Sequence, residues 1–196
     1  MNATDDDADD DGDGNADDGG AGADDGDHDR SWRDVRPMVL GLVWRDGNAP
    51  GEPAADEPEL LVSRLGPFAD DDEVFYRPPG GGVEFGETTA EAVVREFDEE
   101  LDATMTVEGF LGVVENRFEF CGNRNHECCF AFEVAFADDA RYDRRSMHGV
   151  EHDSDVTYET EWATLDDLEA RDEPLYPGGL RELLETDATR VAPPAE

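Results

Sequence analysis

A glycine-rich loop that runs directly into a capped helix constrains this chain more than any other stretch of its sequence. Gly80–Gly82 and Gly86 carry no side chain, so the backbone around them can approach a ligand closely. Thr88 and Glu91 form a capping box, which predicts a helix from Thr88 to Leu101. Its apolar positions share one stripe, as expected for a helix that packs on a sheet. These positions are Ala90, Val93, Val94, Phe97 and Leu101.

Three carboxylates, Glu96, Glu99 and Glu100, occupy an adjacent arc of the same predicted helix. Like charges three or four positions apart cost roughly a few tenths of a kcal/mol each, so an isolated helix gains nothing from them. A hard divalent cation such as Mg²⁺ or Mn²⁺ takes oxygen ligands and offsets this repulsion. The neighbouring Arg95 has a planar fork suited to holding Glu87 across the loop–helix junction. The alternative is a solvated acidic face, which explains neither the glycine loop nor this arginine.

The spacing within this segment resembles the Nudix box, which runs Gly, five residues, Glu, seven residues, then Arg-Glu, an apolar residue, any residue and Glu-Glu. The chain supplies Gly81, Glu87 and Arg95–Leu101 in this register, and the box ends at Ala103. Asp102 stands where the family has glycine. Because Asp tolerates the left-handed conformation better than most residues, we expect only a small local cost. The resemblance extends to Phe75–Gly81, Glu161–Trp162 and Leu165–Leu168 and covers most of 36–187.

The resemblance implies an α/β fold, specifically a Nudix-like α/β/α sandwich with a mixed central sheet. The sequence pattern agrees, since several predicted strands are interleaved with two or three helices. Strands are expected at 37–44, 59–65, 73–76, 106–120, 127–136 and 156–164, and helices at 88–101, 166–170 and 178–184. Residues 46–57, 121–125 and 138–155 are expected to form loops or turns.

The resemblance also implies a metal-dependent hydrolase that cleaves the diphosphate linkage of a nucleoside diphosphate joined to another moiety. The substrate class includes an NTP, ADP-ribose, a dinucleoside polyphosphate and a nucleotide sugar. By position, Glu96, Glu99 and Glu100 resemble the metal ligands, with the Gly81 carbonyl as a further oxygen, for Mg²⁺ or Mn²⁺. The predicted catalytic residues are Glu99, Glu100 and Arg95, and the structural loop–helix residues are Gly80, Gly82, Gly86 and Glu87.

The general base and the substrate contacts stay open at this point. Besides Glu99 and Glu100, the base candidates are Glu159 and Glu161. Arg77 is the best placed arginine for binding the substrate's phosphates, ahead of Arg117 and Arg124. Glu127, next to His126 at the start of a predicted strand, is the second candidate for substrate binding. Two other functions compete with hydrolysis: a non-catalytic nucleotide-sensing module, and an acidic protein whose tail binds a partner.

A zinc site is the competing interpretation of Cys121, His126, Cys128 and Cys129. Structural zinc sites usually take paired cysteines from two separate segments. Adjacent residues on a strand point to opposite faces, so Cys128 and Cys129 are unsuited to one metal ion. We therefore expect small core or half-buried strand residues instead.

The chain is strongly acidic, with 53 acidic and 15 basic residues and a formal net charge of −38. Such a surface repels nucleic acid and anionic membranes. Because the acid is spread throughout the chain, a solvated surface typical of halophilic proteins is favoured over a docking surface for a basic partner or Ca²⁺. We expect a disordered acidic tail at 1–30, a single domain at 31–190 and a cytoplasmic protein. The oligomeric state stays open, and a homodimer is what the resemblance allows.

Overall fold

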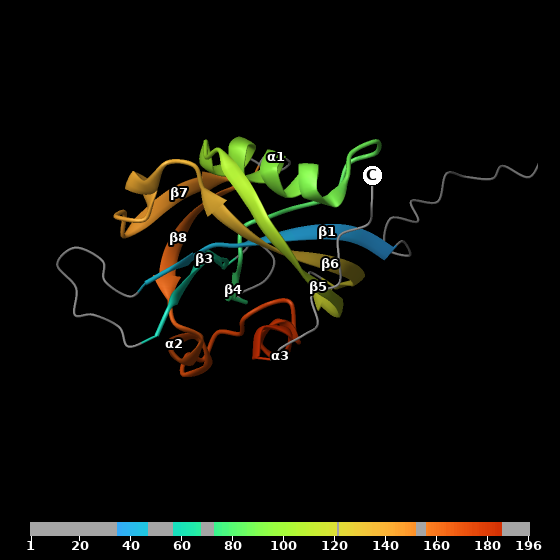
Figure 1. The fold of residues 1–196 in the computed structure, drawn as a ribbon. Helices are drawn as coiled ribbons and strands as arrows, with labels where there is room; N and C mark the ends of the chain where they lie inside the picture. Colours follow the sequence, from blue (N-terminus) through green and yellow to red (C-terminus); the bar gives the residue numbers. More distant parts are fainter. Residues whose placement is uncertain (1–34, 47–56, 68–72, 121, 152–155, 186–196) are drawn as a thin grey trace, which may run out of the picture.

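The described part of the chain folds into three layers, in which two β-sheets lie between helix α1 on one side and helices α2 and α3 on the other (Figure 1). This computed structural model describes residues 35–46, 57–67, 73–120, 122–151 and 156–185, so the predicted tail at 1–30 lies outside the described residues. In chain order, the elements are β1 (Val35–Leu42), β2 (Trp44–Arg45), β3 (Glu59–Leu65), β4 (Phe75–Arg77), α1 (Thr89–Leu101), β5 (Met105–Phe120), β6 (Asn123–Phe136), η2 (Asp139–Arg141), β7 (Ser146–Val150), β8 (Thr157–Ala163), α2 (Leu165–Glu169) and α3 (Leu180–Glu185).

The predicted α/β/α sandwich is confirmed, and its strands form two sheets. The first sheet has the order β1-β6-β5, with β1 parallel to β6 and β6 antiparallel to β5. The second has the order β2-β3-β8-β7, with β4 added on β3, and all its pairs are antiparallel. The Leu61 N–H on β3 donates a hydrogen bond of 3.0 Å to the carbonyl of Val43, which lies between β1 of the first sheet and β2 of the second.

Helix α1 covers the sheets with the predicted apolar stripe. Thr88 caps the helix, and its side chain and that of Glu91 complete the predicted capping box. Val93 and Phe97 are fully buried, and Phe97 lies so close to strand β1 that a Cβ on Gly41 would come within 2.2 Å of its ring. The glycine thus allows the helix to sit tightly on strand β1, which the glycine-rich loop also contacts. Within the described ranges, no helix is both long and apolar enough to cross a bilayer.

Two predicted loops were wrong. The predicted turn at 121–125 is shorter, because β6 begins at Asn123 and forms a long hairpin with β5. The predicted loop at 138–155 contains η2 and strand β7, which pairs with β8. The sequence of β7, Ser-Met-His-Gly-Val, has only one β-branched residue and no aromatic residue, so it offers a weak strand signal. The strand exists because β8 supplies hydrogen-bond partners, which local sequence does not encode.

Asp102 ends helix α1 in the left-handed conformation that the comparison with the box predicted, with φ of 49° and ψ of 45°. Replacing Asp102 with glycine is expected to raise the free energy of unfolding by about 1 kcal/mol. Glycine adopts this conformation without a Cβ penalty, and the change also removes a negative charge from the helix C-terminus. Chemical denaturation in molar KCl measures the effect. Asp102→Ala is the control and should be destabilising, so a gain in both variants would contradict the conformational explanation.

Candidate active site

The glycine-rich loop lies against strand β1 at distances that exclude side chains. Gly80 has a φ of 146°, and a Cβ there would come within 2.1 Å of the Val39 carbonyl oxygen. A Cβ on Gly81 would come within 2.4 Å of the Glu96 carboxylate. The Val39 N–H donates to the Gly81 carbonyl at 2.8 Å, which leaves one lone pair of that oxygen for a further contact. The loop therefore brings bare backbone directly beside the first glutamate of the cluster.

The other two glycines of the predicted loop differ from each other. Gly86 has a φ of 99°, a conformation that side chains rarely adopt. Gly82 has an open position, since a Cβ built there meets no atom within 4 Å. The Gly82 carbonyl nevertheless accepts a hydrogen bond of 2.8 Å from Arg95. Gly82 thus contributes through its backbone oxygen and needs no special freedom.

Arg95 joins the loop to the carboxylates of the helix, as its position predicted. Its guanidinium donates to both Glu87 carboxylate oxygens, at 2.8 and 3.1 Å. It also lies 2.9 Å from the Glu99 carboxylate and 3.1 Å from that of Glu96. Hydrogen bonding to Arg95 lowers the pKa of Glu87, and the pKa of Arg95 is raised in turn. Arg95 therefore fixes the loop and offsets the repulsion that the sequence pattern implied.

Glu96 and Glu100 are buried carboxylates, and burial is the main influence on both. Desolvation raises the pKa of Glu96, although Arg95 opposes the shift. Desolvation raises the pKa of Glu100 to about 7, although the Tyr158 hydroxyl opposes it by donating a 2.5 Å hydrogen bond to the carboxylate. A carboxyl group with this pKa changes its protonation state near neutral pH. Tyr158, on strand β8, is a partner that sequence reasoning missed.

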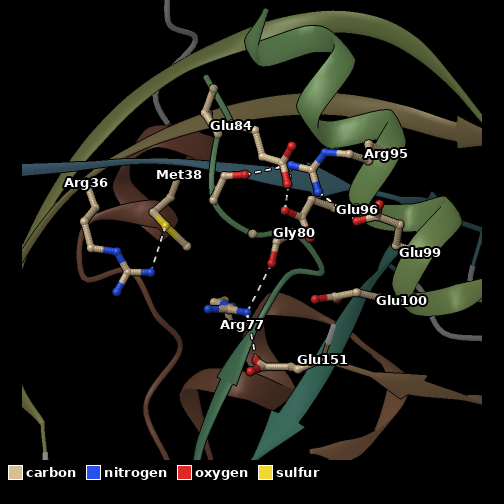
Figure 2. A pocket seen from close by; sticks show the side chains of 13 residues that line it. Arg36, Met38, Arg77, Gly80, Glu84, Arg95, Glu96, Glu99, Glu100 and Glu151 are labelled. Atoms are coloured by element: carbon tan, nitrogen blue, oxygen red, sulfur yellow. Dashed lines mark hydrogen bonds and ion pairs between the residues drawn. The ribbon is translucent and has the colours of Figure 1, made fainter. Parts of the chain in front are cut away.

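These carboxylates line a cavity of about 290 Å³ between α1 and strand β1 (Figure 2). Its wall includes the three glutamates of the helix, the glycines at positions 80–82 of the loop, and Arg95. Arg77 lies between the glutamates of α1 and Arg36, which comes from β1. Arg77 donates to the Gly80 carbonyl at 3.2 Å and lies 3.6 Å from the Glu151 carboxylate. The cavity therefore combines acidic and basic side chains in an arrangement suited to a metal ion and an anionic ligand.

The side chains of the predicted metal ligands line one cavity but do not converge on one point. In the parts of the chain that the structure describes, no three His, Cys, Asp or Glu side chains are grouped closely enough to hold a metal ion. Glu99 is turned towards Arg95, and Glu100 is turned towards Tyr158. The donor set still fits a hard divalent cation, because it consists of carboxylate oxygens and one backbone carbonyl. Binding such an ion at one point would require the side chains of Glu96, Glu99 and Glu100 to move closer together.

A second cavity of about 230 Å³ continues from the first. The two share Arg36, Met38, Arg77 and Glu151 in their walls. Glu127, the other predicted substrate contact, lines only the second cavity. The rest of that wall is rich in aromatic side chains, among them Phe75, Phe118, Phe120 and Tyr176.

Several residues that the sequence nominated lie elsewhere. Glu159 pairs with His148 and Glu161 with Arg171, and neither lines the two cavities. His126 lies 2.9 Å from the Glu115 carboxylate, outside both cavities. The same is true of Arg117 and Arg124. The first cavity contains two acids from outside the helix, Glu84 and Glu151. Glu151 comes from the segment predicted to be a loop.

The zinc interpretation finds no support among the described residues. Cys128 is half-buried and Cys129 is buried, as expected for neighbours on opposite faces of a strand. Burial raises the pKa of Cys129 to about 12, so it stays a thiol. Cys121 lies outside the described residues.

Comparison with known proteins decides the family. Residues 49–185 match the NUDIX domain, which is more than half of the chain. The chain belongs to the NUDIX domain family. As a NUDIX protein, it is a hydrolase that acts on diphosphate bonds.

Solved structures of NUDIX proteins share the fold of this chain. A MutT NUDIX hydrolase from Burkholderia pseudomallei is 24% identical, with a TM-score of 0.52, over 78% of this chain and 97% of that one. A NUDIX hydrolase from Nitrosomonas europaea is 17% identical, also with a TM-score of 0.52, over 82% of this chain and 93% of that one. The comparison with curated proteins found no match.

Proposed function

We propose that this NUDIX protein is a divalent-metal-dependent hydrolase of a nucleotide-type substrate, in which a nucleoside diphosphate is joined to a further moiety. The observation that carries the proposal is the cavity that Glu96, Glu99, Glu100 and the Gly81 backbone line together. The cavity is lined by five glutamates, Glu84, Glu96, Glu99, Glu100 and Glu151, against the three arginines Arg36, Arg77 and Arg95, so negative charge is in excess and a cation is favoured. A metal ion and an anionic substrate together complete the charge balance.

Glu96, Glu99, Glu100 and the Gly81 carbonyl are the groups that would hold Mg²⁺ or Mn²⁺. When bound, such an ion neutralises charge that develops on phosphoryl oxygens. Glu100 is suited to holding or releasing a proton near neutral pH, since its pKa is raised to about 7. Arg95 orients Glu99 and the loop through the contacts described above. A carboxylate bound to the ion is a poorer base, so Glu99 and Glu100 both stay candidates for the general base within the helix.

Arg77 is the proposed phosphate-binding residue, in agreement with its sequence prediction. Its side chain lies between the two cavities and lines both. Its buried Nε has no hydrogen-bond partner among the described residues. A buried donor without an acceptor is costly, and a phosphate oxygen is an acceptor of opposite charge. A small shift of the side chain on binding satisfies that donor.

Hydrolysis of a panel of nucleoside diphosphate derivatives tests the proposal. The panel contains NTPs, ADP-ribose, dinucleoside polyphosphates and nucleotide sugars, with Mg²⁺ or Mn²⁺ in molar KCl. We expect metal-dependent release of phosphate, pyrophosphate or nucleoside monophosphate from at least one of these compounds. Glu99→Gln should reduce kcat by about 100-fold or more, since it removes a charged group beside the reacting phosphates.

Glu115→Gln is the matched control, because Glu115 is exposed on β5 outside both cavities. It removes one negative charge without touching the proposed site, so its kcat should equal that of the parent. Failure of the folded, metal-loaded protein to hydrolyse any compound of the panel would contradict the proposal. A nucleotide-sensing function would then be favoured.

A further inference from the structure

The second cavity contains a row of three polar side chains that crosses the first sheet. Arg36 on β1 is paired with Glu127 on β6, and Glu127 is paired with Asn116 on β5. Neighbouring strands stand about 4.8 Å apart, and directly paired residues project on the same face. All three residues line the cavity. The sheet register therefore presents a cation, a carboxylate and an amide side by side to one ligand.

Glu127 has one ion-pair partner among the described residues, and that contact is long. The residue is 9% exposed, and Arg36 is its nearest cation, at 4.0 Å. Arg36 itself has a side chain that is 53% exposed. Among the described residues, no donor makes a hydrogen bond to the Glu127 carboxylate. Because a mostly buried carboxylate is costly without donors, Glu127 favours a ligand that supplies them.

Aromatic side chains flank the polar row and suit a planar ligand. Phe118 lies two positions beyond Asn116 on β5, so it projects on the same face of the sheet. Its ring is stacked with that of Tyr176, with centroids 6.4 Å apart, and Phe75 contacts Tyr176 edge-on at 5.3 Å. Aromatic surfaces of this kind stabilise bases by stacking, whatever the base. Selection between bases then falls to the polar row.

The position of the row relative to the first cavity fits one substrate that spans both. Arg77 and Arg36 line the two cavities, and Arg77 lies between Arg36 and the carboxylates of α1 (Figure 2). Together the cavities exceed the lower limit of about 300 Å³ for small-molecule sites. A nucleotide with its base on the polar row therefore directs its phosphates past Arg77 towards Glu96, Glu99 and Glu100.

We propose that the second cavity binds the base of the substrate and selects guanine through Glu127, with Arg36 and Asn116 on either side. The inference rests on the proposed function, because the base belongs to the diphosphate substrate. An ionised carboxylate only accepts hydrogen bonds. Guanine presents two adjacent donors, N1–H and the 2-amino group, beside the O6 acceptor. Glu127 accepts from these donors, Arg36 donates to O6, and the Asn116 amide contacts the remaining edge.

The other bases are expected to bind less tightly beside the Glu127 carboxylate. Adenine places the N1 lone pair beside its single amino donor, and cytosine does the same with N3. Uracil has one N–H between two carbonyl oxygens. In each case a lone pair of the base faces an oxygen of Glu127, and repulsion replaces one hydrogen bond. Hypoxanthine keeps N1–H and O6 but lacks the 2-amino group, so it reports the contribution of the second donor alone.

Calorimetric binding of nucleoside monophosphates tests this inference without requiring turnover. GMP, IMP, AMP and UMP are titrated into the full chain with Mg²⁺ in molar KCl. We expect GMP to bind about tenfold or more tightly than IMP, AMP or UMP. Glu127→Gln, which keeps the shape of the side chain, should weaken GMP about tenfold and remove the preference. Glu115→Gln, on the same strand pair but outside the cavity, should keep both.

Equal affinity for the four nucleotides, no binding of any of them, or an undiminished GMP preference in Glu127→Gln would overturn the assignment. The comparison of GMP with IMP changes only the ligand, so it does not depend on the folding of a variant. Hydrolysis of the substrate panel is a separate measurement. Hydrolysis of a panel compound without any preference among bases would contradict only this inference. A preference for GMP without hydrolysis of any compound would contradict the proposed function.

Discussion

Arg95→Ala is expected to lower the free energy of unfolding by about 3 kcal/mol and to reduce hydrolysis by at least about 100-fold. The change leaves Glu87, Glu96 and Glu99 without the guanidinium that contacts all three. It also frees the Gly82 carbonyl and with it the loop that lies beside Glu96. Arg95→Lys should recover part of the stability but little activity, because an ammonium group cannot donate to both oxygens of Glu87 and to Gly82 in one geometry. Denaturation and steady-state kinetics measure both effects.

Arg181 offers a matched control for Arg95. It also pairs with three carboxylates, those of Asp166, Glu169 and Glu185, but it lies on α3 outside both cavities. Arg181→Ala should therefore keep the kinetics of the parent. If Arg95→Ala retained full activity, or if both variants lost it equally, the positioning role of Arg95 would be wrong.

Glu100→Gln is expected to change how stability depends on pH. The pKa of Glu100 is raised to about 7 in the folded protein, above its ordinary value of 4.5, so the folded state holds the proton that the unfolded state has lost between these values. Folding is therefore penalised progressively as pH rises from 4.5 to 7, and fully above 7. Glutamine does not ionise. In metal-free buffer, the variant should gain stability relative to the parent across this window, by on the order of 3 kcal/mol above pH 7.

The variant and parent are compared by denaturation from pH 4 to 9, and the difference between them isolates Glu100 from the many other carboxylates. Tyr158→Phe provides the complementary change, because it removes the hydrogen bond that lowers the pKa of Glu100. In that variant, the free energy of unfolding should fall with rising pH up to a higher pH than it does in the parent. Parallel profiles for Glu100→Gln and the parent would show that the carboxyl group has an ordinary pKa.

The loop and helix could be predicted from sequence because their determinants are local. The capping box sets the start of α1, and the spacing between Glu87 and Arg95 brings the two together once the helix forms. The cluster of Glu96, Glu99 and Glu100 follows from helical periodicity alone. Sequence therefore anticipated the carboxylate end of the site and its arginine.

The rest of the cleft depends on contacts between distant segments. Arg36, Glu127 and Asn116 form a row only because β1 pairs with β6 in parallel and β6 with β5 in one particular register. Nothing in the local pattern of either strand specifies that register. Tyr158 on β8 and Glu151, which follows β7, were missed for the same reason, since β7 and β8 are positioned by pairing with each other and with β3.

The division of the cleft also has a consequence for protein engineering. The three clustered carboxylates belong to α1, whereas the polar row belongs to three strands, and Arg77 lies between the two groups. Positions 36, 116 and 127 can accordingly be randomised together as a library without altering α1 or the glycine-rich loop. If the proposed base site holds, selection from such a library changes which nucleotide is accepted and leaves the proposed hydrolytic residues unchanged.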